Sequence, residues 1–149
     1  MRKLHLLAGA VLLAFALASL RVRAADEVAP NHRPVNEVAS LRISVGTQGT
    51  LPLYVSADWS SPLPDITRAV LVLHGRLRNA DVYYRSARTA QAAAGEAGKA
   101  TIMIVPQFFA GIDVDAYQLP SDTLRWSLEG WEGGDPAVGP VAGQFVRCA

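Results

Sequence analysis

The residues with the clearest chemical potential follow an uninterrupted apolar run, in which Val70 to Leu73 leads into His74-Gly75. A short run of this kind is typical of a strand that is covered on both faces, as in a parallel sheet. A turn after such a strand can present backbone N–H groups at the carboxyl end of the sheet, where they stabilise a developing negative charge. The sequence therefore predicts an anion-binding turn that begins at His74.

The groups that would complete an acyl-transfer site around this turn do not occur in the sequence. No Gly-x-Ser-x-Gly is present, and the histidines are His5, His32 and His74. Because His5 and His32 fall in N-terminal segments, a Ser-His-Asp triad cannot be assembled and no catalytic residue is predicted. We expect His74 to be a structural histidine that bonds to nearby backbone, and not a group that transfers protons.

Neither a metal nor a cofactor is expected. Asp113 and Asp115 form a carboxylate pair, but two acidic residues without an imidazole or a third ligand make a weak site. The single cysteine, Cys148, can form no internal disulfide. The 14 basic residues are scattered, with neighbours only at Arg2-Lys3, and the net charge is +1, so the sequence lacks the basic stripes typical of nucleic-acid-binding proteins and no nucleic-acid partner is predicted.

The first two dozen residues form a separate unit. Arg2-Lys3 precede a largely apolar stretch from Leu4 to Leu20, and small residues follow near Ala24. This pattern predicts a signal peptide over residues 1–24, and hence a secreted or periplasmic protein that meets the membrane only through this leader during export. The alternative is an N-terminal membrane anchor, because the apolar stretch approaches the roughly 17 to 20 residues that span a bilayer.

Two segments follow the leader. Residues 25–39 are polar and contain Pro30 and Pro34, which predicts an extended linker with no structure of its own. From Ser40 apolar and polar residues alternate strictly. A glycine-containing turn at residues 46–50 interrupts the alternation, which then resumes. Two such runs around a turn predict an antiparallel hairpin.

The middle of the chain predicts a strand, a helix and a second strand. The helix is expected over residues 80–94, with Asn79 as its N-cap and with Gly95 and Gly98 as its stop. The strands are expected at residues 69–73 and 102–105, parallel to each other, since a right-handed crossover would join them. Beyond Gln107 no period is sustained, which predicts an irregular, loop-rich tail.

This order of elements resembles the N-terminal half of an α/β-hydrolase, over residues from about Ser40 to Gly134. The resemblance is most specific at His74 to Ala80 and includes the strand that ends in Pro106-Gln107-Phe108. The segment Trp131 to Asp135 resembles a loop that follows the fourth strand in the secreted bacterial branch of that family. The resemblance implies an incomplete α/β-hydrolase sheet: an antiparallel hairpin and a parallel β-α-β unit, preceded by a signal-peptide helix and followed by the loop-rich tail.

The resemblance also implies an activity and its residues. The parent activity is serine-dependent hydrolysis of ester or related acyl substrates, and the motif residues are His74, Gly75 and Asn79. One backbone donor of the oxyanion hole is carried over to Arg76, with Leu77 as the alternate. In the family the second donor is the residue that follows the nucleophile. Because the sequence has no nucleophile motif, residues 40–149 are expected to end before the nucleophile and to be inactive alone. The expected partner is a small-molecule acyl substrate, and the sequence does not define an oligomeric state.

Two further alternatives stay open. The aromatic residues Phe108, Trp126 and Trp131 either line a substrate pocket, as loops at the carboxyl ends of strands do, or anchor their own loop. The function is either that of a truncated hydrolase or that of a non-catalytic secreted binding module. Without further strands, the Val70 to Leu73 strand would form an exposed apolar edge of the sheet.

Overall fold

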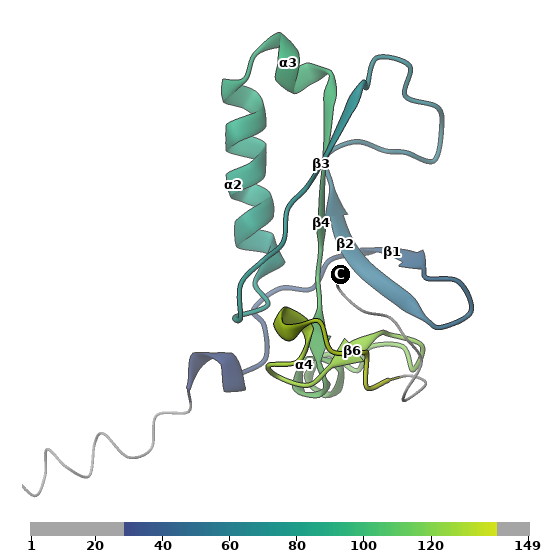
Figure 1. Ribbon diagram of the computed structural model, residues 1–149, viewed down its shortest axis with the longest axis vertical. Coiled ribbons are helices and arrows are strands. Elements are labelled where there is room, and N and C mark those ends of the chain that lie inside the picture. The colour runs from purple at the N-terminus through teal and green to yellow at the C-terminus, as the bar shows by residue number, and fades with distance from the viewer. Residues whose placement is uncertain (1–28, 140–149) are drawn as a thin grey trace, which may run out of the picture.

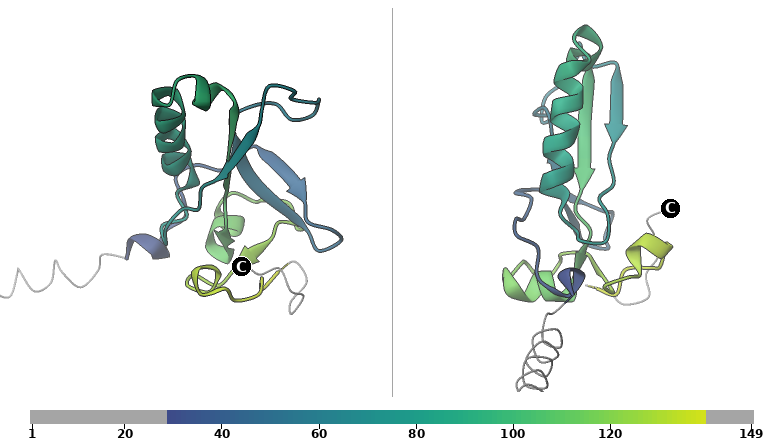
Figure 2. Two further views of the ribbon diagram at one scale, coloured as in Figure 1. Left: turned by 45° about the horizontal axis from the view of Figure 1, so that its top comes forward. Right: turned by 90° about the vertical axis from the view of Figure 1, so that its left-hand side faces the viewer.

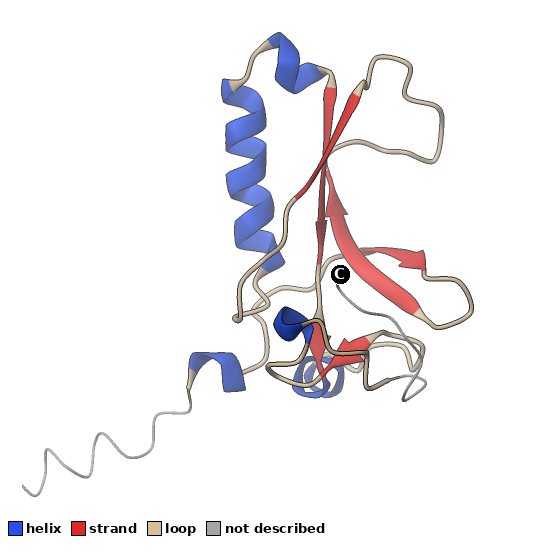
Figure 3. Cartoon of the chain, viewed as in Figure 1, coloured by secondary structure: helices blue, strands red, loops and turns tan. Residues whose placement is uncertain are grey.

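The computed structural model describes residues 29–139, which form a mixed α/β structure around a four-stranded sheet (Figure 1, Figure 3). The strands lie in the order β1-β2-β4-β3. Their bounds are Leu41–Ser44 for β1, Thr50–Val55 for β2, Arg68–Leu71 for β3 and Thr101–Pro106 for β4. The predicted leader lies outside the described residues. Among residues 29–139, no helix has the length and apolar character needed to span a bilayer.

The predicted hairpin is confirmed. Strands β1 and β2 pair antiparallel, with Ile43 opposite Leu51. Strand β2 then pairs antiparallel with β4, where Tyr54 lies opposite Val105. Leu53 and Val105 are almost fully buried, and both lie in strands that have neighbours on each side. Strands β2 and β4 are therefore the two inner strands of the sheet.

The predicted β-α-β unit is also confirmed. Strands β3 and β4 are parallel, with Val70 opposite Met103. Helix α2 (Ala80–Ala93) and the short helix α3 (Glu96–Lys99) connect them. Helix α2 packs against β4 and β2, and the ring of Tyr84 stacks on that of Tyr54 at a centroid distance of 5.2 Å. The sheet thus combines an antiparallel hairpin with a parallel pair.

Strand β3 differs from the expectation for a strand covered on both faces. It lies at the edge of the sheet, beside β4 (Figure 2). All four of its residues are exposed. Leu71 is 61% exposed and Leu73, just beyond the strand, is 48% exposed. Helix α2 lies over β4 and not over β3, so the described residues leave this apolar strand uncovered. The expectation of an exposed edge in the absence of further strands is confirmed.

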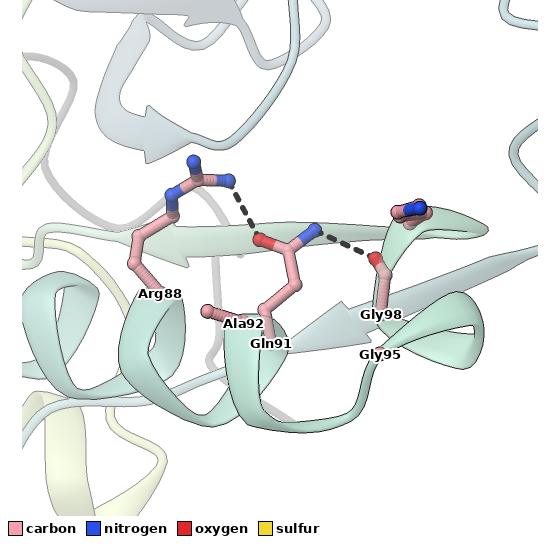
Figure 4. A pocket seen from close by; sticks show the side chains of 6 residues that line it. Arg88, Gln91, Ala92, Gly95 and Gly98 are labelled. Carbon is pink, nitrogen blue, oxygen red and sulfur yellow. Dashed lines mark hydrogen bonds between the residues drawn. The ribbon is translucent and has the colours of Figure 1, made fainter.

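The two predicted stop residues, Gly95 and Gly98, lie at the corner between α2 and α3 (Figure 4). Gly95 has a φ of +57° and a ψ of −128°, a backbone conformation that glycine adopts at low cost because it has no Cβ atom. Gly98 is required by close packing, because a Cβ atom there would lie 1.9 Å from the carbonyl oxygen of Gln91. The side chain of Gln91 reinforces the corner by donating to the carbonyl oxygen of Gly98 at 3.0 Å. A shallow cleft of about 300 Å³ lies over this corner, at the end of α2 farthest from Asn79.

The N-terminal strap, which we define as residues 29–39, corrects the expectation of a linker without structure. It contains a 3-10 turn, η1 (Pro30–His32), and runs along the molecule beside the start of α2 (Figure 1). Val35 is 5% exposed and Ala39 is 2% exposed. Val35 packs with Phe109 and Val114, so the strap is part of the folded domain.

The segment beyond Gln107 corrects the expectation of an irregular tail. Within residues 107–139 the chain forms a small parallel pair of strands and two short helical turns at the carboxyl end of the main sheet (Figure 1). The elements are β5 (Phe109–Ala110), α4 (Gly111–Ala116), β6 (Arg125–Trp126) and η2 (Trp131–Gly133). Each is too short to leave a recognisable period in the sequence.

Candidate functional site

The predicted turn lies at the carboxyl ends of the two parallel strands. Beyond β3 the ladder continues for one bond, in which the amide of Val72 donates to the carbonyl oxygen of Ile104 at 2.9 Å. The chain then leaves the sheet at His74, beside Phe108, which follows the end of β4. The turn therefore sits where the carboxyl ends of parallel strands build sites in open α/β sheets.

His74 is held by backbone on both sides of its ring. Its Nδ1 donates to the carbonyl oxygen of Gly75 at 2.9 Å, and its Nε2 accepts from the amide of Phe108 at 2.9 Å. Together these contacts require the neutral tautomer with the proton on Nδ1. Burial lowers the pKa of His74 below its usual value, since only 3% of the residue is exposed. Both nitrogens are thus engaged in the way expected of a structural histidine.

Gly75 allows a close approach inside the turn. A Cβ atom at this position would lie 3.0 Å from the hydroxyl oxygen of Tyr83, which projects from the first turns of α2. The carbonyl oxygen of Gly75 accepts two hydrogen bonds, from His74 Nδ1 and from the amide of Arg78 at 3.0 Å. Glycine at this position therefore keeps the turn close to α2, and its carbonyl group is fixed from two sides.

The amides of Arg76 and Leu77 are the candidate anion donors. Within residues 29–139, neither amide donates to a protein acceptor. In a trans peptide the C=O and the N–H point in opposite directions. Because the carbonyl oxygen of Gly75 is fixed toward His74 and Arg78, the N–H of Arg76 points away from both of them. The turn thus presents a donor of defined direction at the carboxyl end of β3.

The side chain of Arg76 binds a different part of the chain. It pairs with Glu129, and its Nε lies 3.0 Å from Glu132. These three side chains are exposed by a third or more, so the pairs are screened by solvent and each adds little to stability. They join the turn to the loop that contains Trp131. Removing the Arg76 side chain would loosen this connection and leave the backbone amide in place.

Asn79 stands at the start of α2, as the N-cap prediction requires, but its side chain makes no capping bond. The first turn of the helix is held instead by backbone and acidic groups. The amide of Val82 donates to the carbonyl oxygen of Asn79 at 3.1 Å, and Asp81 accepts from Arg85 at 2.8 Å. Beside this start, a cleft of about 250 Å³ separates α2 from the N-terminal strap and is lined in part by Leu77 and Val35.

The predicted aromatic residues lie together and are buried. The ring of Phe108 stacks on Trp131 at 5.1 Å and meets Trp126 edge-on at 5.3 Å. The ring of His74 lies 4.6 Å from that of Trp131. These side chains contact one another, as expected of residues that anchor their loop. Within the described part of the chain, the indole N–H groups of Trp126 and Trp131 have no hydrogen-bond partner.

Sequence reasoning missed the ion pair at the centre of this region. Arg78 and Asp113 are both fully buried and form an ion pair with a 2.6 Å contact between Nε and Oδ2. Asp113 is therefore bound by an arginine, whereas the neighbouring Asp115 lies on the exposed side of α4. Gln107 is also buried and donates to the carbonyl oxygen of Arg78 at 3.1 Å. The only signal for Arg78 is its place inside the most specific part of the resemblance.

The site contains no cluster of ligands for a metal. Among residues 29–139, no group of three or more His, Cys, Asp or Glu side chains is placed to hold an ion. Comparisons with protein-family models, with curated proteins and with solved structures found no match for this chain. The function proposed below therefore depends on the geometry of the turn and on the resemblance of the residues.

Proposed function

We propose that residues 40–139 belong to the N-terminal part of an exported α/β-hydrolase domain. In this proposal the turn from His74 to Leu77 supplies backbone N–H groups to the oxyanion that forms during serine-dependent hydrolysis of ester or related acyl substrates. The observation that carries the proposal is the amide of Arg76, which has no protein acceptor within residues 29–139 and points away from the fixed carbonyl oxygen of Gly75.

The topology of the sheet supports the proposal. An antiparallel hairpin followed by a parallel β-α-β unit gives the order β1-β2-β4-β3, with β4 in an inner position. The resemblance implies that in the family the third strand lies between the fourth and the fifth, and that the fifth leads to the nucleophile. The exposed apolar residues Val70 and Leu71 on the free edge of β3 suit a further strand at that place.

The chemistry assigned to this chain is limited to binding the oxyanion. The described residues supply one fixed donor at Arg76 and an alternate at Leu77, and the sequence contains no nucleophile motif to supply the second donor. His74 is buried, neutral and bonded at both nitrogens, so it has no role as a base in the proposal. Nucleophile and base must come from residues beyond the described segment or from another polypeptide.

The test begins with the nucleotides downstream of codon 149. We expect a continuation, in any reading frame, that encodes Gly-x-Ser-x-Gly and a late histidine. The joined reading frame, expressed with its leader, should be exported and should hydrolyse p-nitrophenyl esters, and replacing the motif serine by alanine should abolish this activity. An unrelated gene after an intact stop codon, together with a soluble folded product, would contradict the proposal and favour a non-catalytic binding module.

A further inference from the structure

We propose that Arg78 is the positioning residue of the anion-binding turn and that the N-terminal strap holds it in place. This inference rests on the proposed function, because it concerns the same two amides. It assigns a role in the site to a buried ion pair and to residues 29–39, neither of which is a candidate for catalysis.

The guanidinium of Arg78 is fully buried, and all of its nitrogens are engaged. Its Nε and Nη2 form a fork on Asp113, at 2.6 and 3.2 Å. The strap supplies two carbonyl acceptors, Asn31 to Nη1 and Arg33 to Nη2, each at 2.8 Å. A fork on a carboxylate combined with further acceptors fixes the guanidinium plane more rigidly than a single ion pair would.

Arg78 contacts the two peptide groups whose N–H donors face outward. Its backbone amide donates to the carbonyl oxygen of Gly75 at 3.0 Å, and its Nη1 makes a longer contact of 3.4 Å with the carbonyl oxygen of Arg76. Arg78 itself adopts a φ of +57°, which is uncommon for a residue with a side chain. The backbone amide of Arg78 thus closes the turn, and the side chain of Arg78 folds back beneath the same turn.

The direction of the two donors follows from these contacts. The carbonyl group of Gly75 belongs to the peptide that carries the N–H of Arg76, and the carbonyl group of Arg76 belongs to the peptide that carries the N–H of Leu77. Since C=O and N–H oppose each other in a trans peptide, holding both oxygens on the side of Arg78 aims both N–H groups to the other side. Donors that are fixed before the reaction need no reorganisation when the charge forms.

The strap completes the arrangement from outside the sheet. The carbonyl groups of Asn31 and Arg33 accept from the guanidinium, and the amide of Val35 donates to Asp113 Oδ1 at 2.9 Å. The amide of Ala110 donates to Asp113 Oδ2 at 2.8 Å. Loss of residues 29–33 would leave two guanidinium N–H groups without their acceptors. We therefore expect the turn to bind anions well only while the strap is in place.

The experiment follows the backbone amide signals of Arg76 and Leu77 by 15N NMR during titration with methylphosphonate, a tetrahedral oxyanion. The full chain without its leader, beginning at Ala25, is used with Leu71→Lys to suppress association through β3. Both signals should shift with saturation. In Arg78→Met/Asp113→Asn, which removes both charges of the pair, the dissociation constant should rise at least tenfold. Arg85→Met/Asp81→Asn makes the same chemical change in an ion pair on α2 and should bind like the parent.

A second variant removes the strap contacts and keeps the ion pair. A chain beginning at Pro34 lacks Asn31 and Arg33 but retains Val35, and its dissociation constant should also rise at least tenfold. Equal affinity in either variant, with the protein folded by far-UV circular dichroism, would overturn the inference and leave the proposed function standing. Failure of both variants to fold would overturn it too, because the network would then be purely structural. Absence of any shift at Arg76 in the parent chain would remove the proposed function as well.

Discussion

The imidazole of His74 accepts a hydrogen bond from the backbone amide of Phe108 at 2.9 Å, and this contact joins the chain just beyond β3 to the chain just beyond β4. The two strands are parallel neighbours in the sheet. Beyond their last backbone hydrogen bond, the side chain of His74 therefore links the two chain segments. The other nitrogen is bonded to the carbonyl oxygen of Gly75. A neutral ring is therefore a requirement of the fold.

This requirement predicts a dependence of stability on pH. Burial lowers the pKa of His74 in the folded state, so the unfolded chain binds a proton more readily. The contribution of His74 to stability is complete above the unfolded value of about 6.5 and is lost as the pH falls from there toward the folded pKa. Urea denaturation at several pH values between 8 and 5 should show this loss. The variant His74→Gln should be less stable at pH 8 and should lose less on acidification.

The control for that prediction is His32→Gln. His32 is an exposed residue of the N-terminal strap, so the substitution removes a histidine without touching the contact to Phe108. The pH dependence of the parent should persist in this variant. A His74→Gln protein with the same pH dependence as the parent would show that another group carries it.

The free edge of β3 predicts association between chains. An exposed apolar edge strand is a template for pairing with other strands, and a charge on such a strand opposes this. We expect Leu71→Lys to lower the apparent mass at high protein concentration, measured by light scattering after size-exclusion chromatography. Val82→Lys is the matched control, because Val82 is also exposed but lies on α2. If both variants reduce association equally, the edge is not its cause.

The close packing around Gly98 predicts that a single added methyl group at this position lowers the stability of the fold. A Cβ atom there would meet the backbone of Gln91, which cannot move without distorting α2. Gly98→Ala should therefore reduce the free energy of unfolding by about 1–3 kcal/mol or more, as measured by urea denaturation. Gly111→Ala places a methyl group where no atom lies within 4 Å and should change stability much less. Similar losses in the two variants would argue against the close contact.

Under the proposed function, the amide of Arg76 donates to the oxyanion, which predicts an effect on catalysis in the joined reading frame. Arg76→Pro removes the N–H, and the rate constant kcat for p-nitrophenyl esters should fall by about a hundred- to a thousandfold. Arg76→Ala removes the ion pairs with Glu129 and Glu132 but keeps the N–H, so kcat should stay within a few fold of the parent. The thermal midpoint of both variants shows whether the fold survives. Equal kcat values for the two would exclude the amide as a donor.

The present chain without further residues should hydrolyse no p-nitrophenyl ester above the rate in buffer. One fixed donor without a nucleophile leaves the difficult step of acyl transfer unassisted. Turnover that scales with protein concentration and survives repeated purification would mean that a nucleophile exists which the sequence does not reveal.

Several elements could be predicted from the sequence because their signals are local. The alternation from Ser40 gives the hairpin, and the alanine-rich stretch between Asn79 and Gly95 gives α2. The apolar run before His74 gives β3, although the same run suggests a covered strand and the structure has an exposed one. Burial depends on what lies beside a strand, and composition alone does not contain that information.

The centre of the candidate site could not be predicted because its contacts join distant parts of the chain. Arg78 meets Asp113, 35 residues further along, and the strap, 45 to 47 residues earlier. No spacing rule connects such residues. The prolines of the strap favour an extended linker, but the strap contains a 3-10 turn and is held by buried hydrogen bonds to distant residues, which its own sequence does not reveal.

The position of the strap has a consequence for orientation on a membrane. Asn31 touches the guanidinium of Arg78, and the candidate donors at residues 76 and 77 are held pointing away from that guanidinium, so the strap approaches the domain from the side opposite to the donors. If an N-terminal anchor were retained, the side of the domain that carries the strap would be tethered close to the lipid surface. The candidate donors would then face away from the bilayer, and a water-borne acyl compound would reach them from bulk solvent even with the anchor in place.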